Sequence, residues 1–355
     1  MSEITVSIVK KNRDKELFLR FPSKVYDDKH IMQDKVFERE VLENTNVLCK
    51  GVDTIPLIAK NEKEEVTGRC LLSLYKDDDT AYIGFFESVN KEEVANELLN
   101  TAQNLAKDAG KKKLLGPIDL SFWARYRFCT EEGLPYIGEP ANRDYYIGLW
   151  EKFGFLVAEE YSSNFFDIPD EDFESEKAKL RLEEVKKEGY VFCHPDVDNF
   201  EKYLKDICPV LMEGYKDFCG FKKISEEDFI KLYSPLKMVI DPDVVFLAYK
   251  ENRLKGFLIC LPDYGNLLCK PRIPELLVNV MSVKSKAKRY VLLYMGVERE
   301  CPGLGSALSQ MVVDKCREKK ASGISALIHT GKATGGYFKD KIKTQRKYVL
   351  LEKMI

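Results

Sequence analysis

The stretch YVLLYMGVERECPGLGSA, residues 290–307, decides the fold. Its apolar run at residues 290–297 predicts a buried strand, and a helix is predicted from about Gly305 to Lys320. Gly303 and Gly305 have no Cβ, so a ligand can approach the backbone closely. A strand leading through a glycine turn into a helix N-terminus presents free N–H groups that can bind phosphate or pyrophosphate. The alternative is a tight turn without a ligand.

The segments on both sides of this stretch predict an α/β unit. Two strand-like runs joined by a polar turn precede it and predict a hairpin, and two more runs follow the helix. These runs cover residues 244–249, 254–261, 324–328 and 347–351.

The first half of the chain repeats this order of elements. Strands are predicted at residues 55–59, 67–75, 81–87 and 113–118, with a helix at residues 92–108 before the last of them. Setting Gly305 against Glu93 brings the strand ends and helix starts of the two halves into register. We infer two α/β domains of the same architecture that arose by duplication.

Composition and charge agree with a globular protein of two domains. The chain has 355 residues, with 56 Lys and Arg against 58 Asp and Glu, a net charge of −2. A charged segment, residues 169–188, separates the predicted domains at residues 1–168 and 189–355, and its composition predicts a solvated connecting helix. We expect a cytoplasmic location, because residues 1–13 lack the apolar core of a signal peptide and the ten cysteines are scattered singly.

Several partner classes are not expected. The near-neutral charge provides no general cationic field for nucleic acid, and the run KSKAKR at residues 284–289 is typical of a solvated loop. No apolar run approaches the ~20 residues that span a bilayer, so no membrane partner is expected. No metal is expected either, since there are few histidines and no CxxC pair.

The PGLGSA segment, residues 302–307, resembles motif A of the GNAT acyltransferase superfamily, with Val297 at the distance where the family's fourth strand ends. The resemblance implies two tandem GNAT-like domains, each with a mixed, mostly antiparallel central sheet flanked by helices. It also implies that acetyl-CoA or another acyl-CoA is the co-substrate. The pantetheine would pair with the strand near Met295 and Val297. The loop that would bind the pyrophosphate consists of Gly303, Leu304, Gly305, Ser306 and Ala307. Pro302 replaces the family's usual Gln or Arg.

The closing segment resembles the family's motif B, with Ala333 and Tyr337 at the matching spacing. The resemblance makes Tyr337 the candidate acid that protonates the departing thiolate; a phenol with a pKa near 10 is protonated at neutral pH. Its alternative role is packing. The predicted strand 290–297 contains no acid, so His329 is the candidate general base, against a purely structural histidine.

The first half looks degenerate, because Glu93 lies where Gly305 lies in the second. A carboxylate there would repel a pyrophosphate by several kcal/mol, about 4 kcal/mol at 4 Å in an effective dielectric of 20. The whole chain also resembles bacterial two-domain GNAT-like proteins, through segments such as GPIDLS (116–121) and NRDYY (142–146). The tyrosines of NRDYY are interpreted as packing residues or as one wall of an acceptor pocket.

Two functions follow from this resemblance. The first is an N-acyltransferase in which the C-terminal domain binds acyl-CoA and a small-molecule or peptide amine attacks directly from the groove between the domains. The alternative is a non-catalytic GNAT-fold module that binds a small molecule, an acyl chain or a peptide. A tandem pair can mimic a dimer of single domains, so both a monomer and a homodimer are compatible with the sequence.

Overall fold

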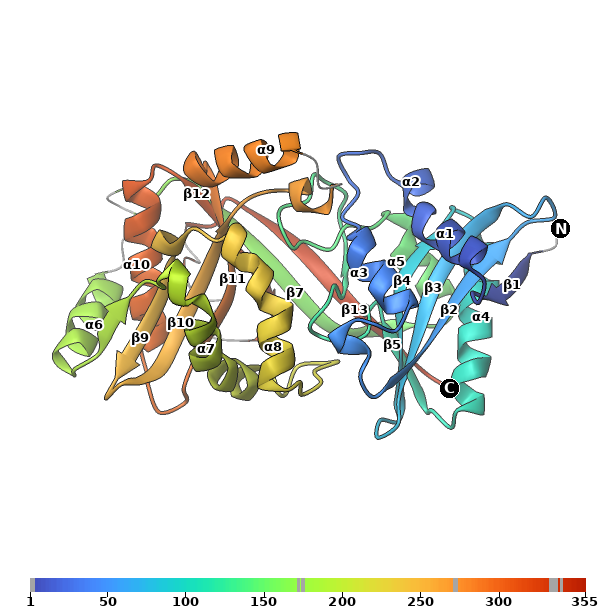
Figure 1. Cartoon of the computed structure of the whole chain (residues 1–355), viewed down its shortest axis with the longest axis horizontal. Helices are drawn as coiled ribbons and strands as arrows, with labels where there is room; N and C mark the ends of the chain where they lie inside the picture. Colours follow the sequence, from blue (N-terminus) through green and yellow to red (C-terminus); the bar gives the residue numbers. More distant parts are fainter. Residues whose placement is uncertain (1–3, 171–172, 174–175, 271–273, 332–337, 339–340) are drawn as a thin grey trace.

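A computed structural model describes residues 4–170, 173, 176–270, 274–331, 338 and 341–355. Figure 1 shows two lobes, each a sheet with helices packed on it, and two long strands that run from one lobe into the other. Among the described residues, no helix has the length and apolar character needed to cross a membrane.

The strands and helices follow the predicted order in both halves. The strands of the first half are β1 (Thr5–Ile8), β2 (Val52–Lys60), β3 (Val66–Tyr75), β4 (Thr80–Ser88), β5 (Lys113–Gly116), β6 (Phe128–Cys129) and β7 (Leu156–Phe166). Its helices are α1 (Asn12–Arg20), α2 (Pro22–Val25), α3 (Lys35–Leu42), α4 (Glu92–Asp108) and α5 (Tyr145–Lys152). The strands of the second half are β8 (Val191–Cys193), β9 (Val245–Lys250), β10 (Arg253–Pro262), β11 (Arg289–Val297), β12 (Ser322–His329) and β13 (Thr344–Met354). Its helices are α6 (Glu176–Lys187), α7 (Phe200–Tyr215), α8 (Glu226–Tyr233), α9 (Pro274–Ser285) and α10 (Leu304–Glu318).

The predicted alignment of the two halves agrees with the helix starts. Gly305 is the second residue of α10 and Glu93 is the second residue of α4, and each helix follows a strand that ends a few residues earlier. The fold class is confirmed: the sheet is mixed, with β4–β5 and β11–β12 parallel and the other described pairs antiparallel. Helix α9, inserted between β10 and β11, was not predicted, and neither were helices α1, α2, α3, α7 and α8 or strand β7.

The two halves share their last strands. The sheet runs in the order β1-β2-β3-β4-β5-β13-β7-β12-β11-β10-β9-β8, so the C-terminal strand β13 lies between β5 and β7. The end of β13 pairs with β5 in the first half, while β7 pairs with β12 in the second half. A long antiparallel ribbon, β7–β13, therefore crosses between the lobes (Figure 1). Strand β13 of the second half thus completes the sheet of the first half, and strand β7 of the first half joins the sheet of the second. The division into domains at residues 168 and 189 stays a prediction.

The two faces of the second-half sheet carry different cores. Neighbouring residues of β10 point to opposite faces, because side chains alternate along a strand. Phe257 packs in the cluster that contains residues of α7 and α8, and Leu258 packs in the cluster that contains α10 and α6. Helix α10 thus covers one face and the α7–α8 pair covers the other.

The charged segment does form a helix, α6, and one side of it is buried. Leu182 and Val185 are buried in the core beside α10. Because α6 packs on α10, the prediction of a solvated connecting helix holds for its outer side alone.

An ion pair joins the lobes away from the ribbon. Lys222 Nζ, in the loop after α7, lies 2.5 Å from Asp78 Oδ2 in the β3–β4 turn, and the Tyr82 hydroxyl also donates to Asp78. Burial raises the pKa of Asp78, but the hydrogen bonds from Lys222 and Tyr82 outweigh it, and the net pKa lies below the usual value. The charged carboxylate is therefore favoured in the folded state.

Asp78→Asn is expected to lower the thermal midpoint near neutral pH and to have less effect in acid. A depressed folded-state pKa stabilises the fold above the unfolded pKa, about 3.9, and this contribution is lost as pH falls through the folded pKa. Thermal unfolding of wild type and variant at about pH 7 and pH 3 measures the difference. Equal differences at both pH values would contradict the assignment.

Candidate functional site

The cavity that we assign as the candidate site opens where β11 and β12 separate. The two parallel strands pair only from Arg289–Ser322 to Leu292–Ser325. Opposite β10, the β11 register shifts between Tyr294 and Leu292, so Leu293 is an extra, bulged residue. A bulge bends a strand and increases its twist. The strands diverge beyond this point and leave a cavity of about 410 Å³ between them.

Both halves of the chain line this cavity. The second half contributes β11 from Leu292 to Val297, β12 from Ser325 to His329, and the end of α7 with Tyr215. The first half contributes part of the loop after β5, notably Tyr126 and Arg127. The predicted positions Met295, Val297 and His329 are thus together at one cavity, and both diverging strands have backbone groups there that do not pair with each other.

The predicted pyrophosphate loop forms the N-terminus of α10. Gly303 is the N-cap residue with φ of 81°, a left-handed conformation that glycine adopts without strain. The amides of Leu304 and Ala307 already donate to Cys301 O and Gly303 O. The amides of Gly305 and Ser306 belong to the first turn, where no intrahelical acceptor exists, so they are the candidates to donate to an anion, although Gly305 itself is buried.

An arginine from α6 lies against this loop. Arg181 Nη2 donates to Pro302 O at 2.5 Å, and a Cβ added to Gly303 would lie 2.1 Å from Arg181 Nε. The side chain also pairs with Glu184 and Glu188 of its own helix. Pro302 lacks the donor side chain that the motif usually has, and Arg181 brings a cation to the same loop from elsewhere in the chain.

His329 is held by a carboxylate from the first half. Its Nε2 is hydrogen-bonded to Glu159 of β7, and its Nδ1 has no partner among the described residues. An ionised carboxylate only accepts, so this contact assigns the ring proton to Nε2 and leaves the Nδ1 lone pair free. The imidazole packs edge-on against Tyr161, with ring centroids 5.0 Å apart. The carboxylate contact is one that a general base would use, but the free nitrogen Nδ1 is itself buried, so a substrate must displace the atoms that cover it.

The other predicted residues do not add to the site described above. Tyr337 and Ala333 are outside the described residues, so the candidate acid stays a prediction. Glu298, after β11, pairs with Lys255 at 2.6 Å. All ten cysteines are free thiols and Cys301 is buried. Tyr146 of NRDYY is fully buried and donates to Glu87, which supports the packing interpretation.

The equivalent opening in the first half is closed. Strands β4 and β5 pair from Thr80 to Tyr82, and the chain after β5 then continues alongside β4, where the Ile118 amide donates to Ile83 O. A Cβ on Gly84 would lie 2.2 Å from Ile118 O, so the contact is tight. The space that remains beside Glu87 and Asp119 is about 20 Å³.

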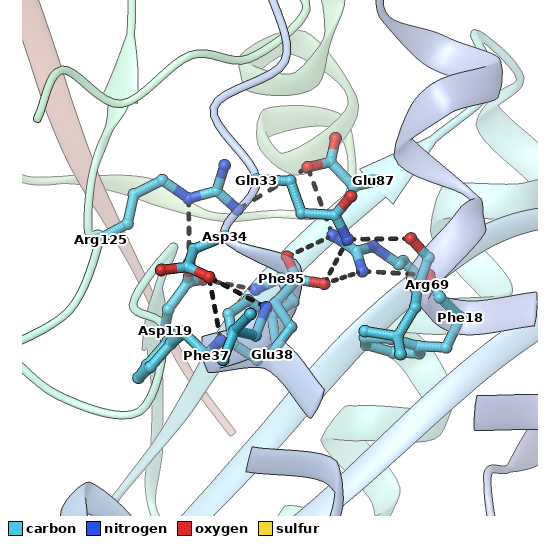
Figure 2. A network of polar contacts seen from close by, with 12 residues as sticks. Phe18, Gln33, Asp34, Phe37, Glu38, Arg69, Phe85, Glu87, Asp119 and Arg125 are labelled. Carbon is cyan, nitrogen blue, oxygen red and sulfur yellow. Dashed lines mark hydrogen bonds and ion pairs between the residues drawn. The ribbon is translucent and has the colours of Figure 1, made fainter. Parts of the chain in front are cut away.

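A buried network of ion pairs stabilises this closed arrangement (Figure 2). Arg69, fully buried, donates to both carboxylate oxygens of Glu38, at 2.6 and 3.0 Å. Arg125 Nε donates to Asp119 Oδ2 at 2.9 Å, and Asp119 Oδ1 accepts from the Phe85 amide. Glu87 lies 3.9 Å from Arg69 and 3.7 Å from Arg125. Burial raises the pKa of Glu87 and of Asp119, so both depend on these arginines for their charge.

The comparisons with known structures define the class of fold. A tandem GNAT protein from the clavulanic acid biosynthesis pathway aligns with 99% of this chain and 98% of its own, at 12% identity and a TM-score of 0.53. A probable N-acyltransferase from Enterococcus faecalis V583 aligns with 100% of this chain and 73% of its own, at 12% identity and a TM-score of 0.54. The chain thus has the GNAT fold in a tandem arrangement.

A curated protein is also similar in sequence. Protein YghO of Escherichia coli K12 is 22% identical over 266 residues, which are 72% of this chain and 67% of that protein. No protein-family model matches the chain.

Three residues at the site were not found from the sequence. Glu159 and Arg181 are ordinary members of charged segments, and nothing in their neighbourhood distinguishes them. Arg127 had a usable signal, because it lies in the aromatic run SFWARYRF at residues 121–128, where a cation is unusual.

Proposed function

We propose that the protein is an acyl-CoA-dependent N-acyltransferase whose co-substrate binds to the C-terminal half. The observation that carries this proposal is the separation of β11 and β12 beside an α10 N-terminus whose first-turn amides at Gly305 and Ser306 donate to no described residue. The cavity volume of about 410 Å³ lies within the range of small-molecule sites. The GNAT fold supports the same reaction class by analogy.

Different parts of the site would bind the pyrophosphate and the pantetheine of acyl-CoA. The amides of Gly305 and Ser306, with Arg181 beside them, would hold the pyrophosphate. The edge of β11 near Met295 and Val297 does not pair with β12 and would hold the pantetheine amides, although Met295 O already accepts from the Tyr215 hydroxyl. Acyl-CoA supplies an activated thioester carbonyl.

His329 would act on the acceptor. In the reaction, the amine nitrogen forms a bond to the thioester carbonyl carbon and the carbon–sulfur bond breaks. His329 Nδ1 would take the proton that the amine loses, once the acceptor displaces the atoms that now cover Nδ1, and Glu159 would stabilise the resulting imidazolium. Tyr337 is the predicted donor of the proton that the thiolate gains.

Gly305→Glu is expected to weaken acetyl-CoA binding at least a hundredfold, because the variant places in α10 the residue that α4 carries as Glu93. A repulsion of about 4 kcal/mol between charges 4 Å apart, at an effective dielectric of 20, accounts for this loss. Calorimetric titration with acetyl-CoA measures it, and the wild type should bind about one equivalent.

Two further variants separate loss of the anion site from loss of folding. Arg181→Ala removes a cation beside the loop without adding a side chain, and it should weaken binding severalfold. Arg299→Ala removes a more exposed arginine near the same loop and should bind like the wild type. No binding by the wild type, or equal binding by Gly305→Glu, would refute the proposed site.

A further inference from the structure

Among the residues that the structure describes, Arg127 is a buried cation without an anion. Its exposed fraction is 4%, and no carboxylate of the described residues forms an ion pair with it. Nη1 donates to Leu327 O at 3.2 Å, while Nε has no hydrogen-bond partner. Arginine stays charged in proteins, and a buried charge is normally paired. The other buried arginine of the first half, Arg69, does have its carboxylates.

Aromatic rings hold the guanidinium in place at the cavity. Its Cζ lies 3.7 Å from the ring centroid of Tyr126 and 4.0 Å from that of Tyr161, and Arg127 lines the cavity. Such cation–π contacts orient an arginine but do not neutralise it. Burial raises the pKa of Tyr126 to about 12, so this phenol is not a phenolate counter-ion at neutral pH.

Arg127 lies on the face of the sheet opposite the predicted CoA loop. A ligand anion that pairs with Arg127 would therefore belong to the acceptor and not to CoA. Tyr126 and Tyr161 belong to the core cluster that contains α7, whereas the start of α10 belongs to the cluster on the opposite face. The loop that would hold the CoA pyrophosphate is therefore across the sheet from Arg127. Arg127 and His329 both line the cavity, and the Tyr161 ring contacts the guanidinium of one and the imidazole of the other. A small molecule in the cavity can therefore approach both residues.

We propose that Arg127 binds the carboxylate of the acceptor, so that the acceptor is an amine that also carries a carboxylate, such as an α-amino acid. This inference deepens the proposed function and rests on it. The amine faces His329 and the carboxylate forms a charge-assisted pair with the guanidinium. A ligand without a carboxylate would leave the buried guanidinium unpaired, so the site should discriminate strongly against such ligands.

The test compares three ligands that differ at one group: phenylalanine, phenylalaninamide and phenethylamine. Release of CoA from acetyl-CoA is followed with each, in wild type, Arg127→Met and Arg127→Lys. The wild type should prefer the amino acid by at least a hundredfold in kcat/KM. Arg127→Met should bring the three ligands within severalfold, mainly through KM for the amino acid, and Arg127→Lys should restore part of the preference.

The matched control is Arg346→Met. Arg346 is also a partly buried arginine stacked on an aromatic ring, Phe165, but it pairs with Glu139 at 2.6 Å. This control should lower the thermal midpoint, since Glu139 loses its cation, and should keep the preference for the carboxylate. Arg127→Met should not lower the midpoint as much, because no carboxylate loses its partner.

The outcomes separate the inference from the function on which it rests. CoA release without preference for the carboxylate, or a preference unchanged in Arg127→Met, overturns the inference and leaves the transferase intact. If the wild type releases no CoA with any of the three ligands, calorimetry with phenylalanine and N-acetylphenylalanine decides. Binding by wild type that is lost in Arg127→Met supports the carboxylate site without the enzyme, and no binding overturns it.

Discussion

Arg69→Met is expected to destabilise the protein by about 3–5 kcal/mol, the largest stability effect that we anticipate for a single substitution. The guanidinium is fully buried and bonds both oxygens of Glu38, with Glu87 at 3.9 Å. Methionine fills a similar volume but leaves Glu38 without its cation and Glu87 with Arg125 alone, and each carboxylate is at most 3% exposed. Urea denaturation of wild type and variant measures the loss.

Arg39→Met is the matched control. Arg39 makes an equally short contact, 2.6 Å to Glu16, but both side chains are more than 40% exposed. Water solvates each partner after the change, so the denaturation midpoint should stay within error. Equal losses in the two variants would show that burial of the Arg69 network (Figure 2) is not what makes it important.

The second large effect is on catalysis. His329→Ala is expected to lower kcat by 10²- to 10⁴-fold, about the contribution of a positioned general base, with little change in the affinity for acetyl-CoA. Added imidazole should restore part of the lost rate, because it can occupy the vacated space and accept the proton. Steady-state CoA release, with and without imidazole, measures both quantities.

Glu159→Gln tests the positioning role of the carboxylate. The amide carries no charge to stabilise the imidazolium, so kcat should fall, though less than in His329→Ala. His30→Gln is the control, because His30 also contacts a carboxylate, Asp27 at 2.7 Å, but lies outside the candidate site. An unchanged rate in His329→Ala would eliminate it as the base.

The sequence was sufficient for the central strands of both halves and for helices α4, α6 and α10. Helix α4 was predicted at residues 92–108 and is observed at Glu92–Asp108, because a long helix with Leu98, Leu99 and Ala102 on one face has a strong 3.6-residue period. The glycine loop before α10 was also recognisable, since a strand, two glycines and a helix lie consecutively in the chain. Such features are local, and a local pattern of residues is enough to specify them.

The tertiary structure alone decided how the halves combine. Nothing in β13 indicates that it lies between β5 and β7, because its alternation fits any neighbouring strand whose register matches. The candidate site also depends on contacts between residues that are far apart in the sequence. Glu159 is 170 residues from His329, Arg127 is 200 from Leu327, and Arg181 is 121 from Pro302. The packing of segments that are distant in the sequence brings these charges to the cavity and to the loop before α10. Such packing produces no periodic pattern in the sequence. It also leaves the cavity of the second half open, while the equivalent space in the first half is closed.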